Sequence, residues 1–166
     1  MLHLIRNLDA TRYAPMILIV AKTDTTSVRR VKAYPHNLPF DRDTVPTYII
    51  PRSREVGQSY CSSILTTLYS FWFAFWLVGA QVQPDLILVN GPGTCLPIAL
   101  SAFFFRIMGW KASKTIFVES FCRVSNLSLT GKLLFPVTDL FVVCWEELEQ
   151  KFPSTHLVTS FIPKRS

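Results

Sequence analysis

Five short apolar segments constrain the fold of this chain more than any other feature. They are Met16–Val20, Thr47–Ile50, Leu86–Val89, Thr115–Val118 and Asp139–Cys144. Nearly continuous apolar runs of this length, flanked by turn residues, are typical of strands that are buried on both faces of a parallel sheet. Such strands need helices or long crossovers between them, so we predict an α/β fold with a mostly parallel, Rossmann-like sheet.

Helical patterns occupy most of the intervening segments. The predicted helices are Met1–Leu8, Gln58–Val82, Cys95–Met108, Gly131–Phe135 and Glu146–Lys151. Residues 28–46 mix charges with three prolines, which predicts mostly a loop with room for one turn of helix. No repeat or low-complexity linker interrupts the series, so we predict one domain over residues 1–153 and a C-terminal tail over 154–166.

Composition narrows the class of protein. Of the 166 residues, 49% are hydrophobic and only 17% are charged, which excludes a disordered chain. The net charge of +6 on so apolar a chain favours a membrane surface, where basic side chains meet anionic headgroups. Nucleic acid is less favoured, because the sequence has no basic run and no zinc-ligand spacing. Its four cysteines are scattered, which indicates a reduced compartment and no metal site.

The segment 64–80 is the most apolar part of the chain. Its first half is amphipathic, whereas Phe71 to Val78 is apolar all round. Pattern alone leaves three alternatives open: an interfacial helix, a buried core helix and a helix that spans a bilayer.

Polar residues follow the predicted strands. The strand ends carry Lys22–Asp24, Arg52 and Arg54, Asn90–Thr94, Glu119–Arg123, and Trp145 with Glu146. In parallel α/β sheets, ligands bind outside the carboxyl ends of the strands. The sequence therefore predicts a binding site at this edge.

Three of these segments have a chemistry that suits a phosphorylated sugar. Asn90-Gly91-Pro92-Gly93-Thr94 precedes a helix, where glycines and free N–H groups bind anions, although a simple tight turn would look alike. Glu119 can accept a hydrogen bond from a sugar hydroxyl or act as a base, and Arg123 can bind a diphosphate. The alternative is that Glu119 and Arg123 pair with each other and close the loop. Arg52 and Arg54 are either a second phosphate clamp or a solvated basic turn.

The order of these motifs resembles that of a single family. The matching segments are Ala21–Asp24, Ile50–Val56, Asp85–Cys95, Val118–Val124 and Leu127–Lys132. From Met1 to about Pro153 the chain resembles the membrane-anchoring subunit of the eukaryotic UDP-N-acetylglucosamine transferase of asparagine-linked glycosylation.

This resemblance implies the acceptor-side half of a two-chain GT-B glycosyltransferase, on the cytosolic face of the endoplasmic reticulum membrane. A soluble partner would bind UDP-N-acetylglucosamine, and the complex would add the second sugar to N-acetylglucosaminyl-diphospho-dolichol. The similar bacterial enzyme carries both halves in one chain. The resemblance implies no metal, no cofactor and no activity of this subunit alone.

The resemblance also assigns roles to residues. Acceptor binding falls to Asn90, Gly91, Gly93, Thr94, Glu119, Ser120 and Arg123, with Glu119 as the one catalytic candidate. The expected membrane face is Phe71, Trp72, Phe75 and Trp76, and the expected partner-docking residues are Leu157, Phe161 and Ile162.

Two departures from the family pattern bear on this expectation. The family begins with an apolar anchor, a first strand and a Gly-Ser-Gly-Gly-His-Thr loop, whereas Met1 falls inside the first helix and that helix has no start signal. We therefore expect a truncated product that lacks the first strand, folds poorly and has little activity. The tail also differs. Two other functions stay open, a self-contained sugar-phosphate enzyme and a membrane-interaction protein anchored by residues 64–80.

Overall fold

A computed structural model describes residues 5, 9, 11–22, 24–34, 38, 40–41, 45–51, 60–91 and 93–158, with only the backbone for residues 25 and 60–65. The chain divides into two compact units, Met1–Arg52 and Ser53–Ser166, and each is described by itself. Both contain parallel strands, so the predicted α/β class with parallel sheets is confirmed.

The described residues of the first unit include two parallel strands and a helix. Strand β1 (Leu18–Ala21) pairs with β2 (Thr47–Ile50), and α2 (Thr25–Lys32) follows β1. Asp24 caps α2 by accepting hydrogen bonds from the N–H and the Oγ of Ser27 at 2.9 and 2.6 Å, and these bonds lower the pKa of Asp24. The sequence predicted at most one helical turn in residues 28–46, whereas the helix begins at Thr25, because this cap and the basic last turn stabilise it before Pro35.

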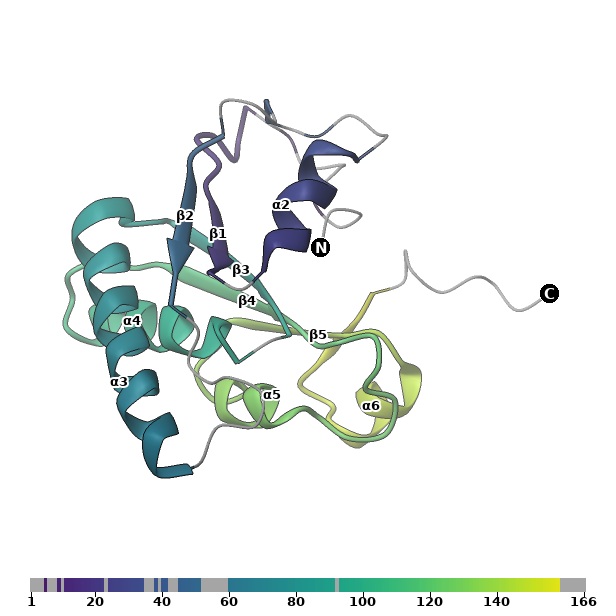
Figure 1. Ribbon diagram of the computed structural model, residues 1–166. Helices are drawn as coiled ribbons and strands as arrows, with labels where there is room; N and C mark the ends of the chain where they lie inside the picture. Colours follow the sequence, from purple (N-terminus) through teal and green to yellow (C-terminus); the bar gives the residue numbers. More distant parts are fainter. Residues whose placement is uncertain are drawn as a thin grey trace. The chain divides into compact units, whose positions relative to one another are not determined.

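The second unit contains a four-stranded parallel sheet in the order β3-β4-β5-β6 (Figure 1). Its strands are β3 (Leu86–Asn90), β4 (Lys114–Val118), β5 (Leu140–Val143) and β6 (His156–Leu157). Its helices are α3 (Tyr60–Trp76), which continues as the π-helix η1 (Leu77–Val82), α4 (Cys95–Ile107), α5 (Leu129–Leu134) and α6 (Glu146–Lys151). The sequence predicted every one of these elements within a few residues except β6.

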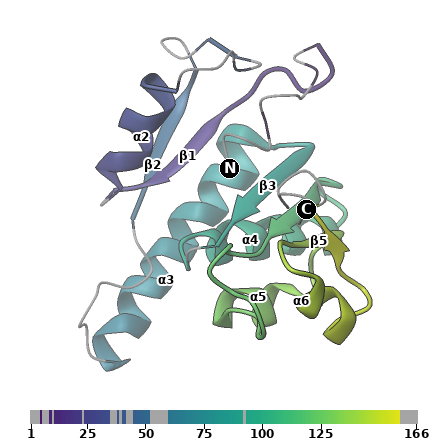
Figure 2. The ribbon, with the colours of Figure 1, turned by 90° about the vertical axis from the view of Figure 1, so that its right-hand side faces the viewer.

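Alternate residues of the central strands form the core of the second unit. The buried positions are Ile87, Val89, Thr115, Phe117, Phe141 and Val143. They share one face because side chains in a strand alternate with a period of two. Helix α4 packs against β3 and β4, and α3 lies beside α4 (Figure 2), where the ring of Phe75 stands 4.4 Å from that of Phe105.

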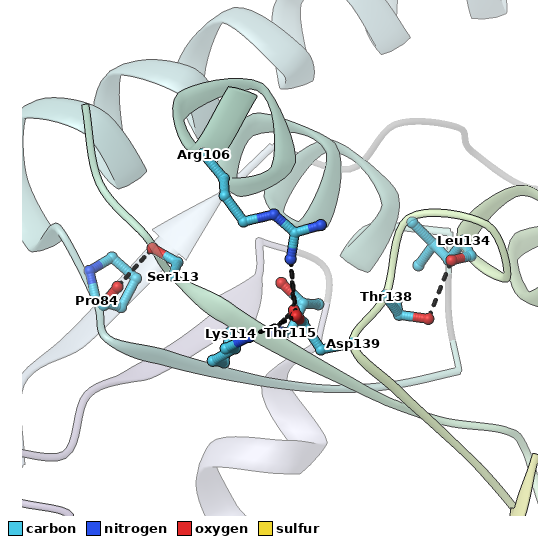
Figure 3. A network of polar contacts seen from close by, with 8 residues as sticks. All are labelled: Pro84, Arg106, Ser113, Lys114, Thr115, Leu134, Thr138 and Asp139. Atoms are coloured by element: carbon cyan, nitrogen blue, oxygen red, sulfur yellow. Dashed lines mark hydrogen bonds and ion pairs between the residues drawn. The ribbon is translucent and has the colours of Figure 1, made fainter. Parts of the chain in front are cut away.

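A polar network joins the amino ends of the strands (Figure 3). The carboxylate of Asp139 accepts a hydrogen bond from the Thr115 N–H at 2.9 Å and lies 2.8 Å from Arg106 Nη1 and 3.1 Å from Lys114 Nζ. Burial alone would raise the pKa of Asp139, but the Thr115 N–H, Lys114 and Arg106 together hold it below its ordinary value. The network fixes β4 and β5 in register and ties them to the end of α4.

The apolar segment 64–80 falls in α3 and η1. On its inner side Ala74, Leu77 and Val78 are buried, whereas Trp72 is 73% and Trp76 is 50% exposed. None of the helices in the described part of the chain is long and apolar enough to cross a membrane.

Candidate functional site

The carboxyl ends of β3 and β4 bring together the two strongest motifs of the sequence. Asn90 is the last residue of β3 and lies opposite Val118, the last residue of β4. The segments that follow therefore leave the sheet at the same edge. A Cβ placed on Gly91 would stand 3.9 Å from the Cβ of Ser120, so the two loops are in contact.

The loop after β3 turns directly into α4. Gly91 has a φ of 69°, a left-handed conformation that glycine adopts without strain. Thr94 is buried and precedes the helix without a side-chain cap. Within the first turn the Leu96 N–H donates to the Gly93 carbonyl at 3.2 Å, and Pro97 has no N–H. The thiol of Cys95 donates to the Asn90 carbonyl at 3.5 Å, and burial raises the pKa of this thiol to about 11. Cys95 thus helps to hold the loop and is not a reactive nucleophile at neutral pH.

Glu119 is fully buried just beyond β4. Its Oε1 accepts from the Ser120 N–H at 2.8 Å, and its Oε2 accepts from the N–H and the Oγ of Ser128 at 2.8 and 3.0 Å. Ser128 in turn caps α5, because its Oγ accepts from the Gly131 N–H at 2.9 Å. Burial, and after it the Glu119 carboxylate, raise the pKa of the Cys144 thiol. The three hydrogen bonds satisfy both oxygens of Glu119 inside the protein.

Arg123 is exposed on the loop that Glu119 closes. Its N–H donates to the Ser120 carbonyl at 2.9 Å, which forms a turn, and none of the contacts described for Glu119 involves it. The sequence left open an internal pair of Glu119 with Arg123. In the structure Glu119 contacts Ser120 and Ser128 instead. Within the described residues Arg123 has no ion pair, and the residue is exposed.

The remainder of this loop is exposed but held at several points of its main chain. Residues 121–126 are all exposed. Trp145 Nε1 donates to the Phe121 carbonyl at 2.7 Å, and the two rings stack with centroids 4.9 Å apart. Lys151 Nζ donates to the Ser125 carbonyl at 3.2 Å and to Asn126 Oδ1 at 2.7 Å. An exposed loop with so many main-chain contacts is preorganised for recognition.

Sequence reasoning missed the residues that hold this loop: Ser128, Gly131, Trp145 and Lys151. The first of them carried a readable signal, because serine directly before a helical segment is a common cap. The contacts of Trp145 and Lys151 join residues more than twenty positions apart, and no local pattern indicates them.

The other predicted site residues lie elsewhere. Arg52, Arg54, Phe161 and Ile162 fall outside the described residues. Leu157 is half-buried in β6, where it pairs with Val143 and its N–H donates to Glu149 Oε1 at 3.2 Å. No group of three potential metal ligands occurs within the described part of the chain.

The expected membrane face divides into exposed and packed side chains. Trp72 and Trp76 project outward, whereas Phe71 is half-buried and Phe75 packs against α4. Further exposed apolar side chains continue this surface on both helices and just beyond α4. They are Leu68, Tyr69, Phe104, Ile107, Met108 and Trp110. We call these six with Trp72 and Trp76 the apolar ridge.

Parallel strands, a glycine turn into a helix and polar loops gathered at one sheet edge define a Rossmann-like ligand-binding half. The comparison with known families agrees with this class. Residues 1–161 match the family described as "Oligosaccharide biosynthesis protein Alg14 like", and the chain belongs to this family.

Curated relatives carry one name. The chain is 43% identical over 152 residues to the "UDP-N-acetylglucosamine transferase subunit ALG14" of Rattus norvegicus, a match that covers 86% of this chain and 68% of the relative. The Homo sapiens protein of the same name is 43% identical over 149 residues, with the same coverage. The Candida albicans protein is 40% identical over 152 residues, which cover 92% of this chain and 67% of the relative.

Proposed function

We propose that this chain is the non-catalytic, acceptor-binding subunit of a heteromeric transferase that moves N-acetylglucosamine from UDP-N-acetylglucosamine to N-acetylglucosaminyl-diphospho-dolichol. The observation that carries the proposal is the carboxyl edge of the sheet, where the Asn90–Thr94 turn meets the loop that bears Ser120 and Arg123. Family membership and the subunit name of the relatives support it. In this proposal residues 1–153 supply the acceptor-side half and residues 154–166 its tail.

The edge suits a sugar diphosphate. The backbone N–H groups of Thr94 and Cys95 and the Arg123 guanidinium would bind the diphosphate oxygens, because both are donors that prefer anions. The Asn90 amide and the Ser120 hydroxyl would bind the hydroxyls of the acceptor sugar. This edge binds and orients the acceptor, and holding two reactants together can itself contribute about 7–11 kcal/mol to the reaction.

A partner chain would supply the donor sugar. The relatives are named subunits, and a cleft-forming transferase needs a second half to bind the nucleotide. We keep Leu157, Phe161 and Ile162 as the proposed docking residues. Because Leu157 belongs to β6, the informative deletion starts after Val158. Loss of co-purification with the UDP-N-acetylglucosamine-binding partner on deleting 159–166 would support docking by Phe161 and Ile162, and retention would refute it for these two residues.

The apolar ridge is the proposed membrane face. Trp72 and Trp76 expose apolar area that would enter the headgroup region of the endoplasmic reticulum membrane on its cytosolic side. Trp72→Ser with Trp76→Ser should weaken co-sedimentation with phosphatidylcholine–phosphatidylserine vesicles at least about tenfold, since each Trp buries a large apolar area. The control is Leu129→Ser with Leu133→Ser, which removes two exposed apolar residues of α5. Equal loss in both double variants would contradict a specific face.

Transfer by the assembled complex tests the function itself. The chain and its nucleotide-binding partner are combined, and transfer of radiolabelled N-acetylglucosamine to N-acetylglucosaminyl-diphospho-dolichol is measured. Arg123→Ala should lower kcat/KM for the acceptor about a hundredfold, the cost of about two charge-assisted hydrogen bonds. Lys111→Ala removes a basic residue that pairs with Asp85 away from this edge, and it should stay at the wild-type rate. Absence of any transfer by the wild-type complex would refute the proposal.

A further inference from the structure

Glu119 is the strongest feature that the proposed function leaves unexplained. A base or nucleophile must present an oxygen to the substrate, whereas this carboxylate is 1% exposed and its two oxygens already accept three hydrogen bonds. Its hydrogen-bond donors are Ser120 and Ser128, the first and the last residues of one loop. The loop between them carries Arg123, the residue on which the proposed acceptor site depends.

We infer that Glu119 is a positioning residue that fixes the 120–128 loop in its acceptor-binding conformation, and not the catalytic group of the complex. This inference rests on the proposed function, which gives the loop its ligand. The carboxylate links the two ends of this loop. It holds the loop at Ser120, where the chain leaves β4, and at Ser128, where the chain enters α5.

The contacts require a hydrogen-bond acceptor at both side-chain oxygens of Glu119. Three hydrogen-bond donors converge on the two oxygens of Glu119, and a carboxylate is an acceptor on both. A glutamine amide would have to aim its NH₂ at a backbone N–H of Ser120 or of Ser128, so one contact becomes donor against donor. Glu119→Gln is therefore nearly isosteric and yet opens one end of the loop.

Gly131 is a second sign that the site is built around this carboxylate. A Cβ at Gly131 would collide with Glu119 Oε2 and approach Ser128 Oγ to 3.1 Å. Gly131, the third residue of α5, therefore lets the first turn of this helix lie directly on the Glu119 carboxylate. Buried Glu119, the helix cap Ser128 and Gly131 together hold this end of the loop rigid, which a solvent-exposed glutamate could not do.

Amide hydrogen exchange tests the positioning role without reference to activity. In the purified chain, Glu119→Gln should raise exchange at Ser120 and Ser128 at least about tenfold and leave the amides of β3 unchanged. Ser128→Ala removes the Oγ contact but keeps the backbone one, so it should raise exchange at Gly131 more than at Ser120. Unchanged exchange at Ser120 and Ser128 in Glu119→Gln would overturn the inference.

Kinetics of the assembled complex test the consequence. Glu119→Gln should raise KM for N-acetylglucosaminyl-diphospho-dolichol about tenfold, with kcat within about threefold and an unchanged pH profile, because a positioning residue moves no proton. KM for UDP-N-acetylglucosamine should not change. A collapse of kcat with an unaltered acceptor KM, or loss of one limb of the pH profile, would show proton transfer and overturn the inference. If the wild-type complex has no transfer, the proposed function fails, and the exchange experiment still decides the role of Glu119.

Discussion

At each edge of the β3–β6 sheet several hydrogen bonds hold a carboxylate next to a strand, Asp139 before β5 and Glu119 after β4, and the partners differ. At the amino edge Asp139 contacts two cations, Arg106 and Lys114, and one backbone N–H. At the carboxyl edge Glu119 is bound only by N–H and O–H groups of Ser120 and Ser128. At the amino edge cationic side chains neutralise the charge of Asp139, whereas at the carboxyl edge uncharged donors bind the carboxylate of Glu119.

This difference explains where a ligand can bind. Because dipoles satisfy Glu119, Arg123 is not needed as its counter-ion and stays exposed beside the strand ends. An arginine already paired with a carboxylate would have to give up that contact before it could bind a diphosphate. In the proposed function the amino edge is a structural clamp, and the carboxyl edge keeps Arg123 for an anionic ligand.

The largest difference between the edges should be in stability. Glu119→Ala leaves two buried N–H groups without an acceptor and creates a cavity, so we expect about 3 kcal/mol less free energy of unfolding. Asp139→Ala should cost about 1–2 kcal/mol, because its side chain is 21% exposed and water replaces part of the contact. Urea unfolding of both variants checks the order. A greater loss at Asp139 would reverse the comparison.

Glycine substitutions sharpen the contrast within the carboxyl edge. Gly131→Ala places a methyl group against Glu119 Oε2 and should destabilise the protein by about 2 kcal/mol despite the better helix propensity of alanine. Gly93→Ala meets only Thr130 Oγ1 at 4.0 Å and should change stability by less than about 0.5 kcal/mol. Thermal unfolding distinguishes them. Equal melting temperatures would show that the first turn of α5 does not need to lie so close to the carboxylate.

The pH dependence of stability should report the amino edge. The pKa of Asp139 is lower when folded than its ordinary value of 3.8, so its contribution is complete above that value and disappears as pH falls through the folded pKa. Asp139→Asn should therefore be about 1 kcal/mol less stable than wild type at pH 7 and nearly equal to it at pH 2–3. Unfolding in urea across this range measures the gap. A gap that persists at pH 2–3 would mean that hydrogen bonding, and not the charge, is responsible.

The smallest effect concerns the two described cysteines beside the candidate site. Burial raises the pKa of Cys95 to about 11, whereas Cys122 is exposed. Iodoacetamide at pH 8 should therefore modify Cys122 at least about tenfold faster, because only an accessible thiolate reacts. Peptide mass spectrometry over time follows both sites in one sample. Comparable rates would show that the Asn90–Thr94 turn opens readily.

Periodic patterns predicted the scaffold well, and the reasons are local. Buried strands such as Thr47–Ile50 and helices such as Glu146–Lys151 carry their signal in consecutive residues. Helix α2 was predicted as one turn at most and without its start at Thr25, because prolines further along the same segment outweighed the Asp24 cap. Strand β6 has only two residues, and its pairing with β5 stabilises it more than any local preference.

The candidate site could be located from sequence but not its internal contacts. Strand ends placed Asn90 and Glu119 at one edge, since parallel strands share a direction. The hydrogen-bond partner of Glu119 depends on how a loop of several residues returns to the strand end. No periodic pattern in the sequence indicates whether that partner is Arg123 or Ser128. The partners of Asp139 come from two other elements, α4 and β4, and are equally hidden in the sequence.

Protection of backbone amides by the acceptor is the most direct test of the central claim, that the carboxyl edge binds the acceptor and the amino edge does not. Hydrogen exchange is measured on the complex of this chain and its nucleotide-binding partner, with and without N-acetylglucosaminyl-diphospho-dolichol. The account predicts slower exchange at residues 93–96 and 120–123 and no change at Thr115 and Asp139. Protection at the amino edge, or none at the carboxyl edge under conditions in which transfer proceeds, would contradict it.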